Sequence, residues 1–127
     1  MPNMTKGQTE ARITEMFIKF LKEYMGRGAI EGKTYIIKDM VIVRLKGVLT
    51  PAEEQLAKTV EGAELVKKTR MLLLEGAKEL VSKAISDILE CNVINMFSDI
   101  CIKKGERFIV FTLDNDCEGN FLNRNLL

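Results

Sequence analysis

Residues 45–59, with the sequence LKGVLTPAEEQLAKT, join a predicted strand to a predicted helix and decide the middle of the fold. The start of the helix is well marked. Thr50 is a typical N-cap residue, Pro51 suits the first helical position, and Glu53 lies three residues after the cap, as a capping box requires. All these residues have structural roles, so the segment predicts architecture and no catalytic chemistry.

A short hairpin is predicted before this junction. Residues 34–38 and 41–46 are rich in β-branched side chains and are separated by a two-residue link, which favours an antiparallel pair. Alternation in the second strand predicts three core-facing and two outward-facing residues: Val41, Val43 and Leu45, and Arg44 and Lys46.

The first helix is predicted from its apolar stripe, over residues 9–25. Its apolar residues recur at helical spacing: Ile13, Met16, Phe17, Phe20, Leu21 and Tyr24. Glycines at 26 and 28 are suited to end it.

The helical region after the junction, residues 51–90, would be about 60 Å long if it were straight. We therefore expect a break near residues 59–62, where Thr59 can cap a second helix and Gly62 weakens continuity. Gly76 marks a possible kink. The predicted inner face of the second helix is Val66, Leu73, Ala77, Leu80, Val81, Ala84, Ile88 and Leu89.

A second hairpin, residues 93–102 and 107–113, completes the predicted order α-ββ-αα-ββ. This order predicts an α+β fold with a four-stranded, largely antiparallel sheet packed with helices. We expect a single domain over residues 5–114 and a loose polar tail over residues 115–127.

Two strand segments, residues 35–37 and 108–111, are apolar at consecutive positions. A strand that is wet on one side alternates, so both faces of the sheet are predicted to be covered. Helices or a second copy of the chain can supply the second cover, and we favour a homodimer.

Length and composition are those of one soluble globular domain: 127 residues, 46% hydrophobic, 29% charged and a net charge of +1. The neutral balance gives no reason to expect nucleic acid binding. No secretory signal or membrane-spanning run is recognisable, so we expect a cytoplasmic protein without direct membrane insertion.

The sequence contains no histidine and no phosphate-binding glycine loop, and we expect no metal, no cofactor and no catalytic site. Cys91, Cys101 and Cys117 lack metal-ligand spacing, and we interpret them as reduced thiols; a paired or reactive thiol is the alternative. If the protein were an enzyme, Cys101 and Asp99 would be its only unusual strand pair.

Four residues are candidates for binding a small ligand. Arg27, Arg44 and Lys46 are cations that could anchor an anion, and Asp99 is a carboxylate within an otherwise apolar strand. Structural roles compete with this interpretation: Arg27 lies where a helix ends, and Asp99 could pair with Arg44 or Lys46.

Six segments carry a family resemblance: residues 5–8, 24–28, 34–36, 39–53, 98–100 and 105–113. Together they resemble the MpsC domain family, of a sodium-translocating, membrane-potential-generating system. The resemblance covers roughly residues 5–114, and its most specific part is the central junction.

The resemblance implies a link to ion or bicarbonate transport and to membrane potential. It brings no established catalytic motif. Because no spanning segment is expected, it implies a non-catalytic accessory or regulatory protein with a membrane transport protein as its partner. The alternative is a small anion or nucleotide binding module.

Overall fold

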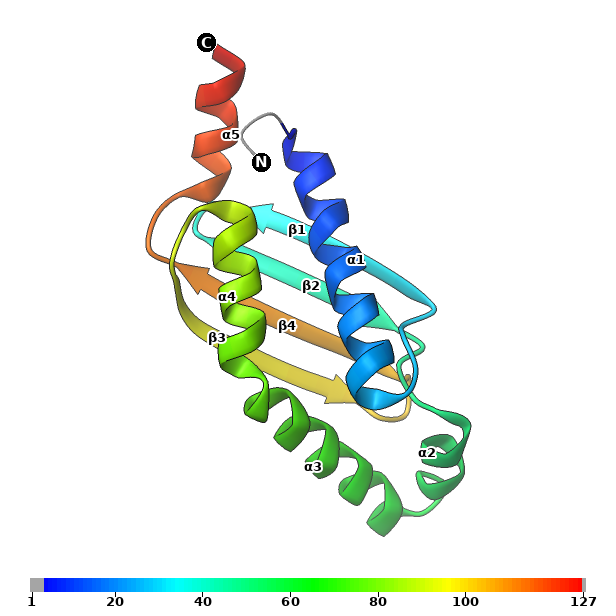
Figure 1. Cartoon of the computed structure of the whole chain (residues 1–127). Helices are drawn as coiled ribbons and strands as arrows, with labels where there is room; N and C mark the ends of the chain where they lie inside the picture. Colours follow the sequence, from blue (N-terminus) through cyan, green and yellow to red (C-terminus); the bar gives the residue numbers. More distant parts are fainter. Residues whose placement is uncertain (1–3, 127) are drawn as a thin grey trace.

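The computed structural model describes residues 4–126 and confirms the α+β class (Figure 1). The elements, in order, are α1 (Lys6–Met25), β1 (Glu31–Ile37), β2 (Met40–Lys46), α2 (Pro51–Leu56), α3 (Val60–Gly76), α4 (Lys78–Leu89), β3 (Val93–Cys101), β4 (Glu106–Leu113) and α5 (Cys117–Leu126).

The four strands form one antiparallel sheet in the order β1-β2-β4-β3. The two predicted hairpins therefore lie side by side, joined through β2 and β4. Their register aligns Tyr35 with Ile42, Ile42 with Val110, and Val110 with Phe97. Side chains of all four strands consequently stand in rows across the sheet.

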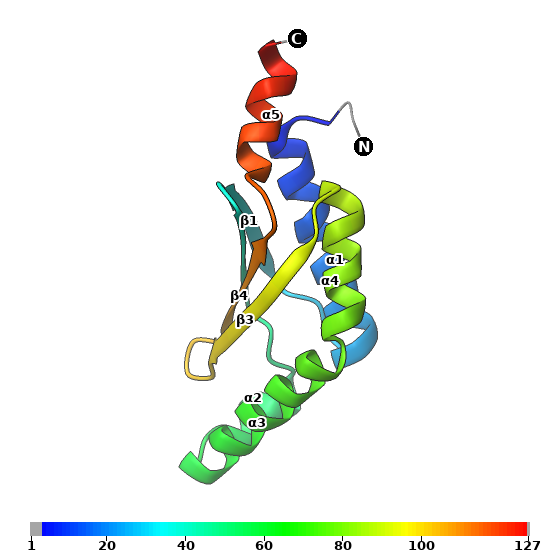
Figure 2. The ribbon, with the colours of Figure 1, turned by 90° about the vertical axis from the view of Figure 1, so that its left-hand side faces the viewer.

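The helices pack on one face of this sheet. Figure 2 shows α1 and α4 on the same side, where α1 contacts β1 and α4 contacts β3. The strands contribute alternate residues to the core beneath them: Ile36, Val41, Val43, Leu45, Ile100, Ile109, Phe111 and Leu113. The outward direction of Arg44 and Lys46 is confirmed.

Of the two alternatives for covering the second face, the one in which helices of the same chain cover it is wrong. Among the described residues, no helix packs against the second face, as Figure 2 shows. The consecutive apolar residues reflect a core on one side and exposed apolar side chains on the other. A second copy remains the other predicted cover.

The junction at residues 45–59 folds as predicted. Thr50 Oγ1 accepts a hydrogen bond from Glu53 N at 3.2 Å, and Glu53 Oε1 accepts one from Thr50 N at 2.9 Å, which completes the capping box. Thr59 caps α3 through Gly62 N at 3.0 Å. A Cβ atom at Gly62 would lie 1.8 Å from the Leu56 carbonyl oxygen, so only glycine permits this close approach of α2 and α3.

Three helix predictions need correction. The first helix begins earlier than expected, at Lys6, because Thr5 and Gln8 form a capping box of their own. The predicted kink at Gly76 is a full break between α3 and α4. Leu73 and Leu80, expected on the inner face, are exposed because they lie beside the buried stripe, which follows Val66, Arg70 and Leu74 in α3 and Val81, Ile85 and Leu89 in α4.

The C-terminal segment is helical, although we expected a loose tail. It forms α5, and Cys117 at its start is joined to Cys91 in a disulfide. The expectation of three reduced thiols is therefore wrong for this pair. The 26-residue separation hid the contact, which arises only when the chain returns past the end of α4. Cys101 is a free, exposed thiol on β3.

Candidate functional site

The uncovered side of the sheet is the first candidate surface, and we call it the open face. Sixteen residues of the four strands, aligned by their register, form four rows across it. In the order β1, β2, β4 and β3, the rows are Glu31–Lys46–Glu106–Cys101, Lys33–Arg44–Phe108–Asp99, Tyr35–Ile42–Val110–Phe97 and Ile37–Met40–Thr112–Asn95.

The middle of the open face is apolar. Phe97 is 58% exposed, and Tyr35, Ile37 and Phe108 are also exposed. These side chains belong to adjoining rows, so they form a continuous patch with the half-buried Ile42 and Val110. Contiguous exposed apolar surface of this kind marks sites of interaction with a protein or ligand.

One end of the open face is charged. Arg44 Nη2 lies 3.1 Å from Glu106 Oε2, and the Arg44 guanidinium stacks over Phe108 at 5.4 Å. Lys46 Nζ lies 3.9 Å from Glu31 Oε1. These pairs occupy β1, β2 and β4.

At the β3 edge of this face, Asp99 supplies negative charge. Asp99 Oδ1 lies 3.2 Å from Lys67 Nζ of α3 and accepts a 2.8 Å hydrogen bond from Ile100 N. The hydrogen bond from Ile100 N, followed by Lys67, lowers the pKa of Asp99 below its ordinary value. The predicted pairing of Asp99 with Arg44 or Lys46 is wrong, because the sheet places these residues on different strands with Phe108 between Arg44 and Asp99.

A hollow of about 270 Å³ lies beside β1 and β2 at the charged end. Its lining includes three cations, Lys33, Arg44 and Lys46, and the ring of Tyr35. Among the described residues, Arg44 Nε is the one buried side-chain nitrogen or oxygen that lacks a hydrogen-bond partner. An anion could accept from it, although Glu31 and Glu106 already balance two of the cations.

Three of the four predicted ligand-binding residues lie on one face of the sheet, but only two of them, Arg44 and Lys46, line the same hollow, and Asp99 lies apart at the β3 edge. Arg44, Lys46 and Asp99 lie on the open face, whereas Arg27 donates from Nη1 to the Leu49 carbonyl oxygen at 3.1 Å and has a structural role. The exposed aromatic residues of the open face were missed. They could have been found from their alternate spacing, because every second residue of a strand lies on the same face of the sheet. The series are Lys33, Tyr35 and Ile37 in β1 and Phe97, Asp99 and Cys101 in β3.

On the covered face, a buried arginine ties the junction to α3. Arg70 Nε donates to Glu53 Oε2 at 2.8 Å, and Nη2 donates to Glu53 Oε1 and, at 2.8 Å, to the Val48 carbonyl oxygen. Glu53 therefore closes the capping box and pairs with Arg70 at the same time. Burial alone would raise the pKa of Glu53, but hydrogen bonds from Arg70 and Thr50 outweigh it and lower that pKa.

A second buried arginine lies beside the first. Arg107 Nε donates to Ser98 Oγ at 3.1 Å, and both terminal nitrogens lie 3.4 Å from the Arg70 carbonyl oxygen. Burial, with a smaller contribution from the neighbouring Arg70 charge, lowers the pKa of Arg107 to about 10, so the side chain stays charged at neutral pH. Both arginines have structural hydrogen-bond partners, and neither is presented to a ligand.

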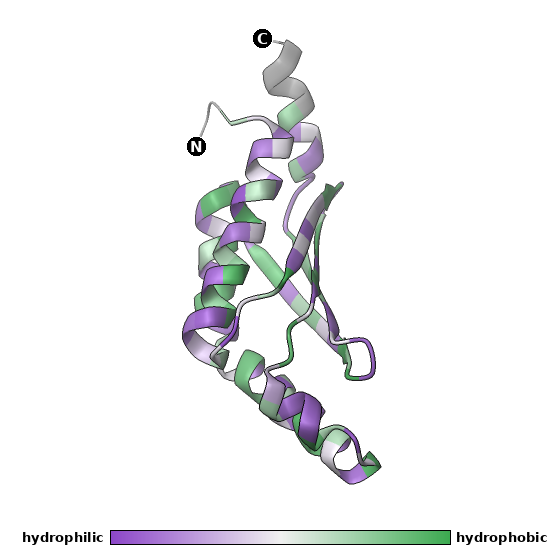
Figure 3. Ribbon diagram, turned by 90° about the vertical axis from the view of Figure 1, so that its right-hand side faces the viewer, coloured by the Kyte–Doolittle hydropathy of each residue, from purple (hydrophilic) through white to green (hydrophobic). Residues whose placement is uncertain are grey.

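Another candidate surface is an apolar stripe on α3, a helix that projects past the end of the sheet (Figures 2 and 3). We call Leu65, Leu72 and Leu73 the α3 stripe. They are 54%, 62% and 46% exposed and recur at seven- and eight-residue spacing, which places them on one side of the helix. Three exposed leucines on one side of a projecting helix are typical of a surface that contacts another protein.

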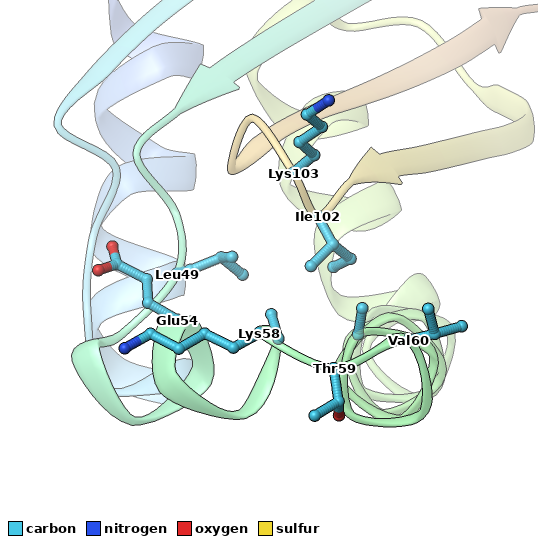
Figure 4. A pocket seen from close by; sticks show the side chains of 9 residues that line it. Leu49, Glu54, Lys58, Thr59, Val60, Ile102 and Lys103 are labelled. Atoms are coloured by element: carbon cyan, nitrogen blue, oxygen red, sulfur yellow. The ribbon is translucent and has the colours of Figure 1, made fainter.

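A hollow of about 460 Å³ lies between α2, the start of α3 and the β3–β4 turn (Figure 4). Leu49 and Ile102 point into it, whereas the charged ends of Glu54, Lys58 and Lys103 point in different directions. Polar groups that do not converge cannot orient a substrate, so this hollow has the character of an apolar surface depression.

Two further properties bear on function. Residues 4–126 contain no group of three or more cysteine, aspartate or glutamate side chains that could hold a metal ion. Within the same residues, no helix combines the length and the hydropathy needed to cross a membrane.

The fold and these surfaces define a small α+β domain with an antiparallel sheet that its own helices cover on one face. The chain belongs to the family described as "Na+-translocating membrane potential-generating system (MpsC)", whose model matches residues 5–115. The predicted family resemblance is thus confirmed. The protein is related to a sodium-translocating, membrane-potential system.

Two relatives come from Bacillus subtilis (strain 168). "Uncharacterized protein YbcI" is 40% identical over 116 residues, which are 91% of this chain and 94% of that protein. "Uncharacterized protein YrhF" is 30% identical over 97 residues, which are 76% of this chain and 80% of that protein. No solved structure matches the chain.

Proposed function

We propose that the protein is a soluble, non-catalytic accessory subunit of the membrane system for which its family is described, and that it meets a membrane transport protein on the cytoplasmic side. The observation that carries the proposal is the α3 stripe. Leu65, Leu72 and Leu73 are exposed on a helix that projects from the body of the molecule.

The partner expected at the stripe is an apolar surface on the cytoplasmic part of a membrane protein. The family description supports a membrane partner. The mixed charge beside the stripe, with Glu61, Glu64, Lys67 and Lys68, supports a protein partner over an anionic lipid surface, which attracts helices that are rich in lysine and arginine.

The test compares the full chain with a Leu65→Ser/Leu72→Ser variant in binding to membranes from cells that contain the family's transport system. We expect the wild type to sediment with these membranes and the variant to lose at least tenfold in affinity, since a few apolar residues dominate most interfaces. Glu75→Ser, an exposed substitution on the same helix but outside the α3 stripe, is the matched control and should bind as wild type.

Protein-free vesicles of the same lipids separate the two kinds of membrane target. Binding to these vesicles that equals binding to the membranes would overturn the proposal of a protein partner. Failure of the wild-type protein to sediment with either the membranes or the vesicles would also overturn the proposal.

A small-anion binding module is the second candidate, favoured by the hollow beside β1 and β2. The unpartnered Arg44 Nε and the nearby Lys33 and Lys46 are the groups that would receive an anion. Titration with inorganic phosphate tests this function: saturable heat that is lost in Arg44→Gln supports it, and the absence of saturable heat contradicts it.

A further inference from the structure

We infer that the open face binds a second copy of this chain, with a twofold axis between the two sheets and parallel to their strands. The inference is independent of the proposed accessory function, because its residues lie on the sheet and not on the α3 stripe; it competes with the anion-binding candidate, which uses the same Lys33 and Lys46. It assigns the exposed apolar patch to a self-association surface, with the helices of both copies on the outside.

The apolar rows are self-complementary under this symmetry. A twofold axis parallel to the strands places β1 of one copy over β3 of the partner and β2 over β4, and it keeps each row at the same level. Tyr35 then faces the partner's Phe97, and Ile42 faces the partner's Val110. Packed sheets lie about 10 Å apart and cross at about 30°, which allows side chains at the centre of both faces to interdigitate.

The charged rows are complementary in the same arrangement. Lys33 on β1 faces the partner's Asp99 on β3, and Lys46 on β2 faces the partner's Glu106 on β4. The symmetry repeats each pair, so four oppositely charged pairs surround one end of the apolar contact. Opposite charges across an interface fix register and exclude other arrangements.

The other face-to-face arrangement has its twofold axis perpendicular to the strands, and charge disfavours it. That axis places each strand over the same strand of the partner and reverses the order of the rows. Lys33 would then face the partner's Tyr35, and Asp99 would face the partner's Phe97. Each contact would bury a charge against an apolar ring without a counter-charge, which is costly.

The size of the open face predicts a weak dimer. Four strands spaced by about 4.8 Å, each about seven residues long, cover about 440 Å² per copy in projection. Two such faces bury an area at the low end for specific association, so we expect a dissociation constant on the order of micromolar.

The test is sedimentation velocity of the full chain over about 1 to 100 µM. We expect a concentration-dependent dimer. Phe97→Asp should abolish it, because the substitution buries a carboxylate at the centre of the contact. Leu72→Asp, at an equally exposed site on α3, is the matched control and should dimerise as wild type.

A charge exchange tests the axis. Asp99→Lys should weaken the dimer at least tenfold by facing the partner's Lys33. Adding Lys33→Asp should restore the dissociation constant to within about threefold of wild type, since the pair is reformed with its signs exchanged. All these side chains are exposed, and circular dichroism will show that each variant is folded.

A wild-type monomer at the highest concentration would overturn the inference, as would a dimer that Phe97→Asp leaves intact. A dimer that is sensitive to Phe97→Asp but indifferent to the charge exchange would overturn the assigned axis. Neither result bears on membrane binding through the α3 stripe, so a failure here is separate from a failure of the proposed function.

Discussion

The two faces of the sheet are built from neighbouring residues of the same strands, yet one face is buried under helices and the other is exposed. Phe111 is fully buried under the helices, whereas Phe108, three residues earlier on β4, is 39% exposed on the open face. The arginines differ in the same way. Arg70 of α3 is buried on the covered side among backbone and carboxylate partners, whereas Arg44 of β2 stacks on Phe108 in contact with solvent.

We therefore expect side chains on the covered face to determine the stability of the fold and side chains on the open face to determine binding. On the covered face, an apolar or charged side chain contributes to the free energy of folding, because its removal leaves a cavity or an unpaired group. On the open face, apolar and charged side chains stay in contact with water, so they contribute little to the free energy of folding and remain available to a partner. Substitutions in matched pairs should therefore affect unfolding on one face and association on the other.

The largest effect is expected for the phenylalanine pair. Phe111→Ala should lower the free energy of unfolding by about 3–5 kcal/mol, because it opens a cavity between the sheet and α1, where Phe111 packs on Phe17. Phe108→Ala should cost less than about 1 kcal/mol, since its ring is only partly buried. Urea unfolding at low protein concentration measures both. Equal losses would mean that the two faces are alike in burial.

The arginine pair should show a smaller contrast. Arg70→Met removes the cation that holds Glu53 and the Val48 carbonyl, and we expect a loss of about 3 kcal/mol. Arg44→Met removes a half-exposed ion pair and should cost less than about 1 kcal/mol. Thermal unfolding at neutral pH measures the difference. An Arg70→Met variant as stable as wild type would contradict the structural role assigned to this arginine.

The smallest effect is the acid dependence that comes from Glu53. Its pKa is lower in the folded state than the ordinary value of 4.5, so its stabilising contribution is complete above pH 4.5 and is lost as the pH falls through the folded-state pKa. Glu53→Gln should therefore flatten the fall of stability with pH below 4.5. The free energy of unfolding, followed from neutral pH to acid, measures this slope in both proteins. An unchanged slope would mean that Glu53 gains nothing from Arg70 as an ionised group.

The local elements could be predicted where a short-range signal exists. The Thr50–Glu53 capping box, the Thr59 cap and the alternation of Val41, Val43 and Leu45 each depend on residues a few positions apart. The expected order of elements accordingly agrees with the structure up to the end of β4.

Long-range features could not be predicted in this way. The pairing of Cys91 with Cys117 and the contact of Arg70 with Glu53 depend on how distant segments meet. The run of consecutive apolar residues in β4 also did not distinguish the two faces. Such a run is compatible with a sheet that is covered on both faces and with a sheet that exposes apolar side chains on one face. Only the arrangement of the helices shows which of these residues belong to the open face.

The most direct test of a self-associating open face is hydroxyl-radical footprinting of aromatic side chains at low and high protein concentration. Tyr35, Phe97 and Phe108 report on the open face, and Tyr24, which is 55% exposed on α1, is the internal control. We predict that the three open-face rings become protected as the concentration rises while Tyr24 keeps its reactivity. Open-face rings that react equally at every concentration, or protection of Tyr24 alone, would contradict the account.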